Sequence, residues 1–148
     1  MTITSTDGRG ISKMAGETKV EAGIFYTKEH EYAKPTADGL VIVGVDDYAQ
    51  AQLHEIVYVE LPKMGVDVVQ GKAIGAVESV KAVSDMFSPI SGKIVEINQA
   101  LLDSPDKINS DPYGEGWIAK IQPVSLEMDL TRLMDSDKYK QYLSTLKH

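Results

Sequence analysis

The sequence contains no cysteine in its 148 residues. This absence excludes disulfides, a thiol nucleophile and thiolate metal ligands, so any sulfur chemistry has to come from an attached group. A chain without cysteine suits a reducing compartment. We therefore expect a cytoplasmic protein, or a mitochondrial matrix protein if the source is eukaryotic, although residues 1–23 lack the acid-poor composition of a transit peptide.

Positive charge and long apolar runs are also scarce. The sequence has 22 acidic residues but only 15 Lys and Arg, which gives a formal net charge of −7 and a pI near 4.9. No basic field is available to attract nucleic acid or anionic lipid. The longest apolar runs, such as residues 39–45, are far shorter than the roughly 20 residues of a membrane-spanning helix. We expect a soluble protein without nucleic-acid or membrane partners.

The sequence lacks the short motifs of common enzymes. It has no glycine-rich dinucleotide or phosphate loop and no Gly-x-Ser-x-Gly elbow. The histidines at positions 30, 54 and 148 are isolated, and without cysteine they do not complete a zinc motif. Pairs of nearby carboxylates are expected by chance in so acidic a chain. We therefore expect a non-catalytic protein with no catalytic residue and no metal site.

From residue 24 onward, short apolar runs separated by turn residues predict a mainly β domain over residues 24–148. With 43% hydrophobic residues, the chain is able to bury one core. Residues 1–23 are polar and are predicted to form a flexible tail. The predicted strands are Ile24–Thr27, Glu31–Pro35, Leu40–Val45, Ile56–Leu61, Ala73–Val80, Ala82–Phe87, Gly92–Ile97 and Trp117–Pro123.

Helices are predicted to be short and peripheral. Asp46 is expected to cap a helix over residues 47–53. Ser104 is expected to cap a helical turn that has Pro105 in its first position. After residue 123, apolar residues at helical spacing predict two helical segments that cover the end of a sheet, with Ser136 as the cap of the second.

One segment, residues 75–92, differs from the rest of the chain. Two β-prone runs flank a centre that has no Gly, Pro or Asn, and Lys81 stands at this centre between Val80 and Ala82. The pattern predicts a hairpin with Lys81 at its tip. Taken alone, such a lysine is usually a solubilising charge, and the alternative of an unmodified β-rich interaction domain stays open.

The run Glu78-Ser79-Val80-Lys81-Ala82 resembles the lipoyl attachment site of the glycine cleavage system H proteins, which belong to the biotinyl/lipoyl-attachment superfamily. Biotinyl domains flank their lysine with methionines, and lipoyl domains of the 2-oxo-acid dehydrogenase complexes usually have Asp-Lys-Ala. Val80 before Lys81 favours the H protein. Further segments resemble parts of the same family, namely residues 27–32, 44–50, 53–62 and 111–117.

The sequence also departs from the family pattern at several positions. Tyr32 stands where Trp is usual, His54 where Gly is usual, and Asp46 where Thr is usual. None of these positions lies in the attachment motif. Pro112 and two glycines predict a turn before Trp117, which we expect to begin a strand and to fill one end of the core.

The resemblance implies a flattened β-barrel or two-sheet sandwich of the lipoyl/biotinyl hammerhead type, with short peripheral and C-terminal helices. It implies lipoate in amide linkage to Lys81, on an arm that carries the aminomethyl group of decarboxylated glycine. The implied partners are glycine decarboxylase (P protein), aminomethyltransferase (T protein), dihydrolipoyl dehydrogenase (L protein), and a lipoate ligase or lipoyl/octanoyl transferase. An H-like relay that serves lipoyl transfer or another pathway is the second reading.

A carried cationic amine needs a groove that offers carboxylates and excludes water. Glu31 and Asp85 are the candidates for this groove, with Glu29 and His30 as weaker ones. Glu78 and Asp85 also place negative charge beside the tip. This charge could guide the attaching enzyme or a basic partner surface.

Overall fold

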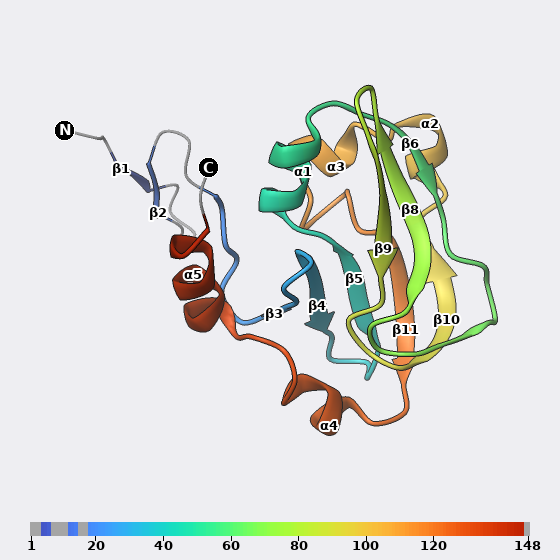
Figure 1. Cartoon of the computed structure of the whole chain (residues 1–148). Helices are drawn as coiled ribbons and strands as arrows, with labels where there is room; N and C mark the ends of the chain where they lie inside the picture. Colours follow the sequence, from blue (N-terminus) through green and yellow to red (C-terminus); the bar gives the residue numbers. More distant parts are fainter. Residues whose placement is uncertain (1–3, 7–11, 15–17, 147–148) are drawn as a thin grey trace.

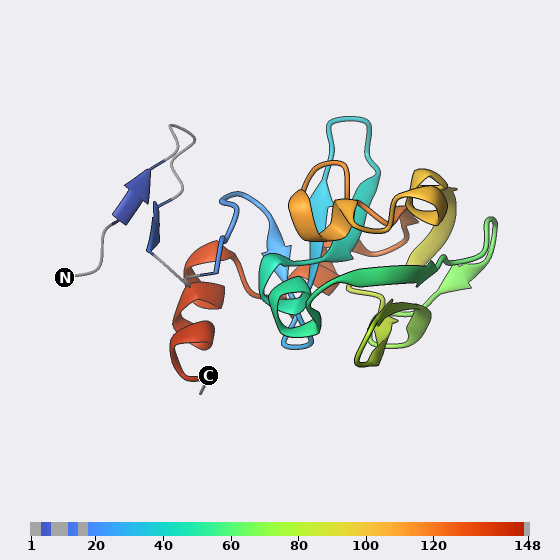
Figure 2. The ribbon, with the colours of Figure 1, turned by 90° about the horizontal axis from the view of Figure 1, so that it is seen from above.

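The computed structural model describes residues 4–6, 12–14 and 18–146 (Figure 1). Two antiparallel sheets pack face to face, and short helices lie at their ends (Figures 1 and 2). The larger sheet ends at strands β3 and β7, which do not pair with each other, so the arrangement is an open two-sheet sandwich and not a closed barrel. The predicted mainly β fold with short helices is confirmed, in its sandwich form.

The larger sheet has the strand order β3-β4-β5-β11-β10-β7, with every neighbouring pair antiparallel. All the strands predicted for it are present, within two residues at each end. The short β7 was not predicted. The bounds are β3 (Phe25–Tyr26), β4 (Glu31–Pro35), β5 (Val41–Val45), β7 (Asp67–Val68), β10 (Gly92–Ile97) and β11 (Ala119–Pro123).

The smaller sheet consists of β6 (Ile56–Glu60), β8 (Ala73–Ser79) and β9 (Val83–Phe87), in the order β6-β8-β9. Its inner face packs against the larger sheet through buried side chains. Val59 and Val77, which are paired in register, lie on this face. Burial does not alternate strictly along β6 and β8, because both strands contain a register shift, but Val59 and Val77 fix the face that packs on the core.

A second core region joins the larger sheet to the C-terminal helix. We call Tyr26, Tyr32, Tyr113 and Tyr139 the tyrosine cluster; all four are buried, and Tyr26 and Tyr139 stack with ring centroids 4.2 Å apart. The Tyr139 hydroxyl donates to the buried carboxylate of Asp46. The Tyr32 hydroxyl donates to the carbonyl of Pro112 at 2.6 Å. These bonds satisfy hydroxyls that would otherwise be costly to bury.

Helix α1 (Asp47–Leu53) has the predicted bounds, and Asp46 caps it by accepting a hydrogen bond from the Ala49 N–H at 2.9 Å. The helix ends at His54, whose φ is 67° and whose ψ is −146°. Glycine adopts this region readily, whereas a residue with a Cβ is strained there. His54 therefore carries backbone strain that a glycine at this position would not have.

The prediction that Ser104 caps a helix at its N-terminus is wrong. Ser104 is the C-cap of α2 (Ala100–Asp103), and Asp106 is the residue before α3 (Lys107–Ser110). The carbonyls of Ser104 and Pro105 instead accept bonds three residues on, which forms a tight turn before α3.

Helix α4 (Leu126–Leu130) is followed by α5 (Ser136–Ser144), in which Ser136 is already helical. The cap of α5 is Asp135, which has an extended backbone and accepts from the Lys138 N–H at 2.8 Å. The prediction chose the serine where the neighbouring aspartate caps. None of the described helices is long and apolar enough to cross a membrane.

In the N-terminal segment, β1 (Thr4–Thr6) and β2 (Ser12–Met14) form an antiparallel pair. Residues 1–3, 7–11 and 15–17 lie outside the described residues, and the flexible tail over 1–23 stays a prediction. Val20 is buried in the same core region as the tyrosine cluster. The Lys19 N–H donates to Asp47 at 2.7 Å. Contacts with the folded part thus begin before residue 24.

Candidate functional site

Strands β8 and β9 form a hairpin (Figure 1). Residues 80–82 connect the two strands, so Lys81 lies at the tip. Ser79 closes the hairpin, because its N–H donates to the Ala82 carbonyl at 2.8 Å. Its hydroxyl oxygen accepts from the Lys81 N–H at 3.3 Å and from the Ala82 N–H at 3.1 Å. A serine side chain thus supplies the local bonds of the turn, which explains how a tip without glycine is held. The predicted hairpin is confirmed.

The Lys81 side chain is exposed. Among the residues that the structure describes, none forms a hydrogen bond or an ion pair with its ammonium group. Since neither burial nor a partner occupies this group, an enzyme approaching from solvent has access to it.

Glu78 lies three positions before Lys81 and pairs with Val83 on β9 and with Tyr58 on β6. These three side chains lie on the outer face of the smaller sheet, opposite the buried Val59 and Val77. Glu78 is half-buried by its neighbours. It therefore contributes negative charge close to Lys81, as predicted from the sequence.

Glu31 lies elsewhere, in a hollow of about 270 Å³ between β9 and the segment after α4. Only 2% of Glu31 is exposed. Its carboxylate accepts from the Thr27 hydroxyl at 2.6 Å and from the Phe87 N–H at 3.2 Å. Burial raises the pKa of this carboxyl to about 7, although both hydrogen bonds favour the ionised form. The hollow thus contains a buried carboxyl whose charged form is disfavoured by burial.

Glu29 and His30, the two weaker candidates for the groove, lie in different parts of the structure. Glu29 lines the same hollow as Glu31. His30 is part of the packing around α5, where its Nδ1 lies 2.7 Å from the Tyr139 hydroxyl and its ring lies against Tyr48. Burial lowers the pKa of His30 to about 4, so the ring is neutral at pH 7. The structure therefore places His30 with the tyrosine cluster rather than in the hollow.

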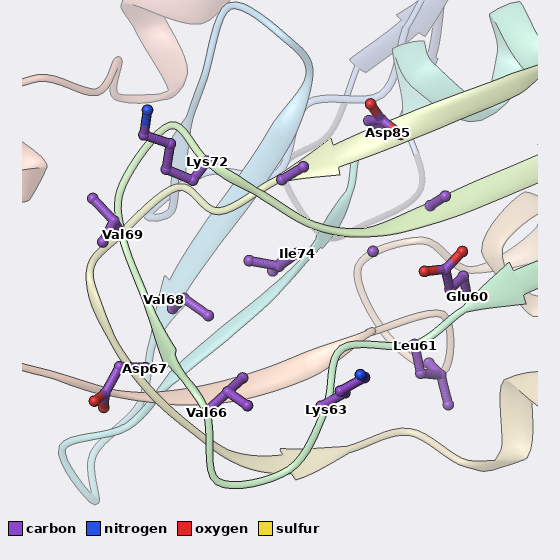
Figure 3. Close-up of a pocket in the computed structure, with 13 residues that line it drawn as sticks. Glu60, Leu61, Lys63, Val66, Asp67, Val68, Val69, Lys72, Ile74 and Asp85 are labelled. Carbon is purple, nitrogen blue, oxygen red and sulfur yellow. The ribbon is translucent and has the colours of Figure 1, made fainter.

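Asp85 lines a second hollow, of about 460 Å³, which is bordered mainly by strand β8 and the segment that connects β6 to it (Figure 3). It is exposed, and it lies across Ala76 from Glu60 in the strand register. Asp85 is nevertheless only two residues before Phe87, whose N–H binds Glu31. The two predicted groove carboxylates thus line different hollows and are connected through β9.

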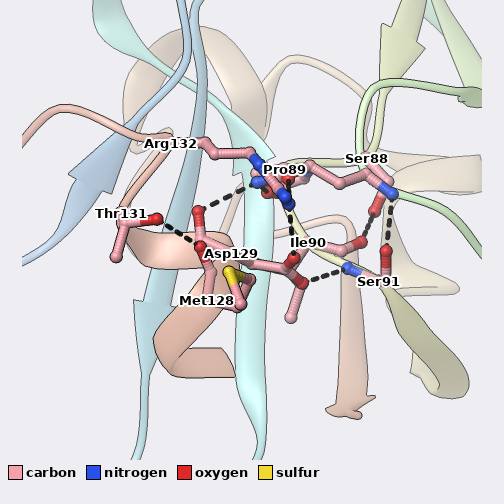
Figure 4. A network of polar contacts seen from close by, with 9 residues as sticks. Ser88, Pro89, Ile90, Ser91, Met128, Asp129, Thr131 and Arg132 are labelled. Atoms are coloured by element: carbon pink, nitrogen blue, oxygen red, sulfur yellow. Dashed lines mark hydrogen bonds and ion pairs between the residues drawn. The ribbon is translucent and has the colours of Figure 1, made fainter. Parts of the chain in front are cut away.

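A polar network that the sequence did not predict borders the Glu31 hollow (Figure 4). The buried carboxylate of Asp129 accepts from the Ser91 N–H at 2.8 Å and pairs with Arg132 at 3.6 Å. Gln70 accepts from Arg132 at 3.1 Å and donates to the carbonyls of Pro89 and Asp129. Gln70 and Arg132 both line the hollow. Their separation of 62 positions gives no spacing signal in the sequence.

Only part of the segment 111–117 contributes to the core. Trp117 is half-buried and lies outside both core regions, with the Lys120 ammonium 5.3 Å from its ring centroid. The strand begins at Ala119, so the prediction that Trp117 begins it and fills the core is wrong. Tyr113 fills the core instead, and its hydroxyl donates to the Lys19 carbonyl at 2.7 Å.

Comparison with known proteins gives consistent results. The family model described as "Glycine cleavage H-protein" matches residues 24–146. The chain is 54% identical over 131 residues to a probable glycine cleavage system H protein of Pyrococcus horikoshii, covering 88% of this chain and 97% of that one. It is 49% identical over 121 residues to the glycine cleavage system H protein of Thermus thermophilus, covering 82% and 93%.

A solved structure agrees. The crystal structure of a glycine cleavage system H protein from Mycobacterium marinum matches with a TM-score of 0.77 at 37% identity, covering 84% of this chain and 99% of that one. An open β-sandwich that presents a lysine on a hairpin is the lipoyl/biotinyl type of carrier domain. Within that class, the chain belongs to the glycine cleavage H-protein family.

Proposed function

We propose that this chain is the lipoyl carrier of a glycine cleavage system, with lipoate in amide linkage to Lys81. The observation that carries the proposal is the exposed Lys81 ammonium at the tip of the β8–β9 hairpin, inside the Glu78–Ala82 motif. Family membership supports the same role. The chain itself positions the arm, and the bond-making steps belong to its partners.

When bound, the lipoyl group supplies a dithiolane that accepts the aminomethyl group from a pyridoxal-phosphate glycine decarboxylase, yields it to a tetrahydrofolate-dependent aminomethyltransferase and is reoxidised by dihydrolipoyl dehydrogenase. The strands β8 and β9 hold the base of the arm in place, since their ladder ends only two residues from Lys81. The exposed tip leaves Lys81 open to successive partners. A lipoate ligase or a lipoyl/octanoyl transferase would attach the group.

The proposal assigns the Glu31 hollow to protection of the carried amine. Strand rise places Asp85 about 13 Å and Phe87 about 20 Å along the chain from Lys81. Phe87 borders the hollow and binds the Glu31 carboxylate. Because that carboxyl is buried, pairing with an ammonium group would favour its ionised form. Asp85, exposed on β9 between the tip and the hollow, would contact the cation on its way.

Intact-mass measurement tests the attachment site. The apo protein is incubated with lipoate, ATP and a lipoate ligase, and we expect one lipoyl group per chain. Lys81→Arg should gain none, while the control Lys72→Arg, which alters another exposed lysine, should gain one. Lipoylation of Lys81→Arg would disprove the assignment. With purified decarboxylase and aminomethyltransferase, only the lipoylated protein should support glycine-dependent release of carbon dioxide.

A second measurement tests the hollow. Glu31→Gln and Asp85→Asn should still gain one lipoyl group per chain but should lose the carried aminomethyl group to water faster. Glu60→Gln is the matched control, since Glu60 lies in register with Asp85 across Ala76 and is exposed. If both variants retain the group as long as wild type does, the assignment of these carboxylates is wrong.

A further inference from the structure

Four large apolar side chains are exposed around Lys81. We call Val57, Tyr58, Val80 and Val83 the tip patch; their exposed fractions are 46%, 48%, 75% and 65%. Single exposed apolar residues are ordinary on protein surfaces, whereas a group of them beside one functional side chain marks a contact surface. The tip patch therefore requires an explanation that the arm alone does not give.

The strand register explains why these side chains face solvent. Tyr58, Glu78 and Val83 form one row across β6, β8 and β9, on the face opposite the buried Val59. A register shift between Ile56 and Tyr58 makes Val57 an extra residue in β6. Such a bulge redirects side chains locally, and both Val57 and Tyr58 are about half exposed as a result.

Apart from Lys81, the charged side chains in register beside the tip patch are acidic. Glu78 lies in the middle of the exposed row, and the next row along the same face carries Glu60 and Asp85 at its ends. Lys81 is the cation at the tip, and a partner that modifies it has to remove its charge. The surface is therefore complementary to an apolar surface bordered by basic residues.

Reach indicates which partner covers this surface. The nitrogen of a lysine side chain lies at most about 6 Å from its own Cα, and neighbouring Cα atoms are about 3.8 Å apart. An enzyme that reacts with Nζ must therefore enclose the tip and contact Val80 and Val83. Enzymes that act on the dithiolane work at the far end of a much longer arm, and they need no close contact with these side chains.

We propose that the tip patch is the docking surface for the enzyme that acylates Lys81, an inference that rests on the proposed function. In this reaction the amine of Lys81 forms a C–N bond with the carboxyl carbon of an acyl adenylate, made from ATP. The C–O bond to AMP breaks and AMP leaves; two of the three ammonium protons go to solvent and the third stays on the amide nitrogen, while pyrophosphate was released when the adenylate formed. The tip patch holds the hairpin in place while this reaction occurs.

The test compares initial rates of lipoyl addition by a lipoate ligase at increasing concentrations of apo protein. The double variant Tyr58→Thr/Val83→Thr removes apolar surface on the outer face and keeps residues suited to strands. We expect KM to rise about tenfold, as for interface residues of intermediate importance, with kcat unchanged. The control Val124→Thr/Met128→Gln alters two exposed apolar residues, one after β11 and one on α4, and should behave as wild type.

A competition assay separates docking from chemistry and from misfolding. Lys81→Arg keeps the tip patch and should inhibit lipoylation of the wild-type protein competitively. Lys81→Arg combined with Tyr58→Thr and Val83→Thr should inhibit about tenfold less strongly, while both proteins show the same melting temperature. Equal inhibition by the two would overturn the proposal.

The remaining outcomes are also decisive. If the double variant is lipoylated with the wild-type KM but no longer supports glycine decarboxylation, the tip patch serves the decarboxylase and the proposal is wrong. If wild-type protein gains no lipoyl group at Lys81, the proposed function fails. If wild type is lipoylated and the double variant has an unchanged KM, the docking surface alone fails.

Discussion

The hairpin tip and the tyrosine cluster use polar groups in opposite ways. At the tip, Lys81 is exposed and the hydrogen bonds of the turn come from one serine, Ser79. In the tyrosine cluster, rings are buried and the Tyr139 hydroxyl bonds to the buried Asp46. The comparison suggests that the group offered to partners sits where stability does not depend on it. The predictions below test whether the two regions separate in this way.

The largest effect is expected from Tyr139→Ala. This change removes a ring that is 0% exposed and stacked on Tyr26, together with the hydroxyl that serves Asp46 and His30. We expect the free energy of unfolding to fall by about 3–5 kcal/mol, as for other buried aromatic residues. Denaturant unfolding measures this loss.

The matched control for Tyr139→Ala is Tyr58→Ala, which removes a tyrosine that is about half exposed beside the tip. We expect its free energy of unfolding to change by less than about 1 kcal/mol. Below the unfolding transition, Tyr139→Ala should still be lipoylated at the wild-type rate. A comparable loss of stability in both variants would contradict the separation of the two regions.

The next effect is a dependence of stability on pH that originates in the buried carboxyls. Burial raises the pKa of Asp46 from 3.8 to about 8 and that of Glu31 from 4.5 to about 7. The folded protein thus retains protons that the unfolded chain has lost. The free energy of unfolding therefore falls as pH rises toward the pKa values of the folded protein. The lowered pKa of His30, about 4 against 6.5, acts oppositely but only below pH 6.5.

Between pH 6.5 and 8 the carboxyls therefore dominate, and we expect the free energy of unfolding of wild type to fall by about 1–2 kcal/mol. Asp46→Asn keeps a capping side chain for α1 but cannot ionise, so its fall over the same range should be smaller. Unfolding by urea at several pH values measures this. An equal fall in both proteins would show that Asp46 is not the source.

These two regions also differ in how far the sequence predicted them. The strands around Lys81 follow from alternating apolar residues and turn residues, and the hairpin is a local structure of adjacent segments. The burial of Asp46 and Glu31 depends on partners far away in the chain, such as Tyr139 and Phe87. Single-sequence patterns contain no signal for such contacts.

Local competition explains the remaining errors. Asp135 precedes the predicted cap Ser136, and the geometry of the chain entering α5 decided between two residues that both suit a cap. Strand β7 has two residues and exists through its pairing with β10, so its own sequence shows no strand pattern. Gln70 and Arg132 meet only because the segment after α4 folds back onto the turn at Gly71.

A smaller effect is expected at His54, which lies on the connection between α1 and β6. This connection joins the region of the tyrosine cluster to the sheet that carries the hairpin tip. Its φ of 67° and ψ of −146° strain a residue that has a Cβ, and its side chain is exposed. We expect His54→Gly to raise the melting temperature and to stabilise the protein by about 1 kcal/mol. His54→Ala, which keeps the Cβ, is the control and should not stabilise. A loss of stability in His54→Gly would contradict the argument from strain.

The smallest change in stability, with a change in function, is expected from Ser79→Ala. The substitution leaves the Lys81 and Ala82 N–H groups without their serine acceptor, but water replaces it at the exposed tip. The free energy of unfolding should therefore fall by less than about 1 kcal/mol. A less ordered tip costs more free energy to fix in an enzyme's active site, so lipoylation should slow about two- to tenfold.

The control is Ser84→Ala, which alters an exposed serine on β9 and should be lipoylated normally. If Ser79→Ala were lipoylated at the wild-type rate, the order of the turn would be irrelevant to its partners; if it unfolded the protein, the tip would belong with the tyrosine cluster as a source of stability.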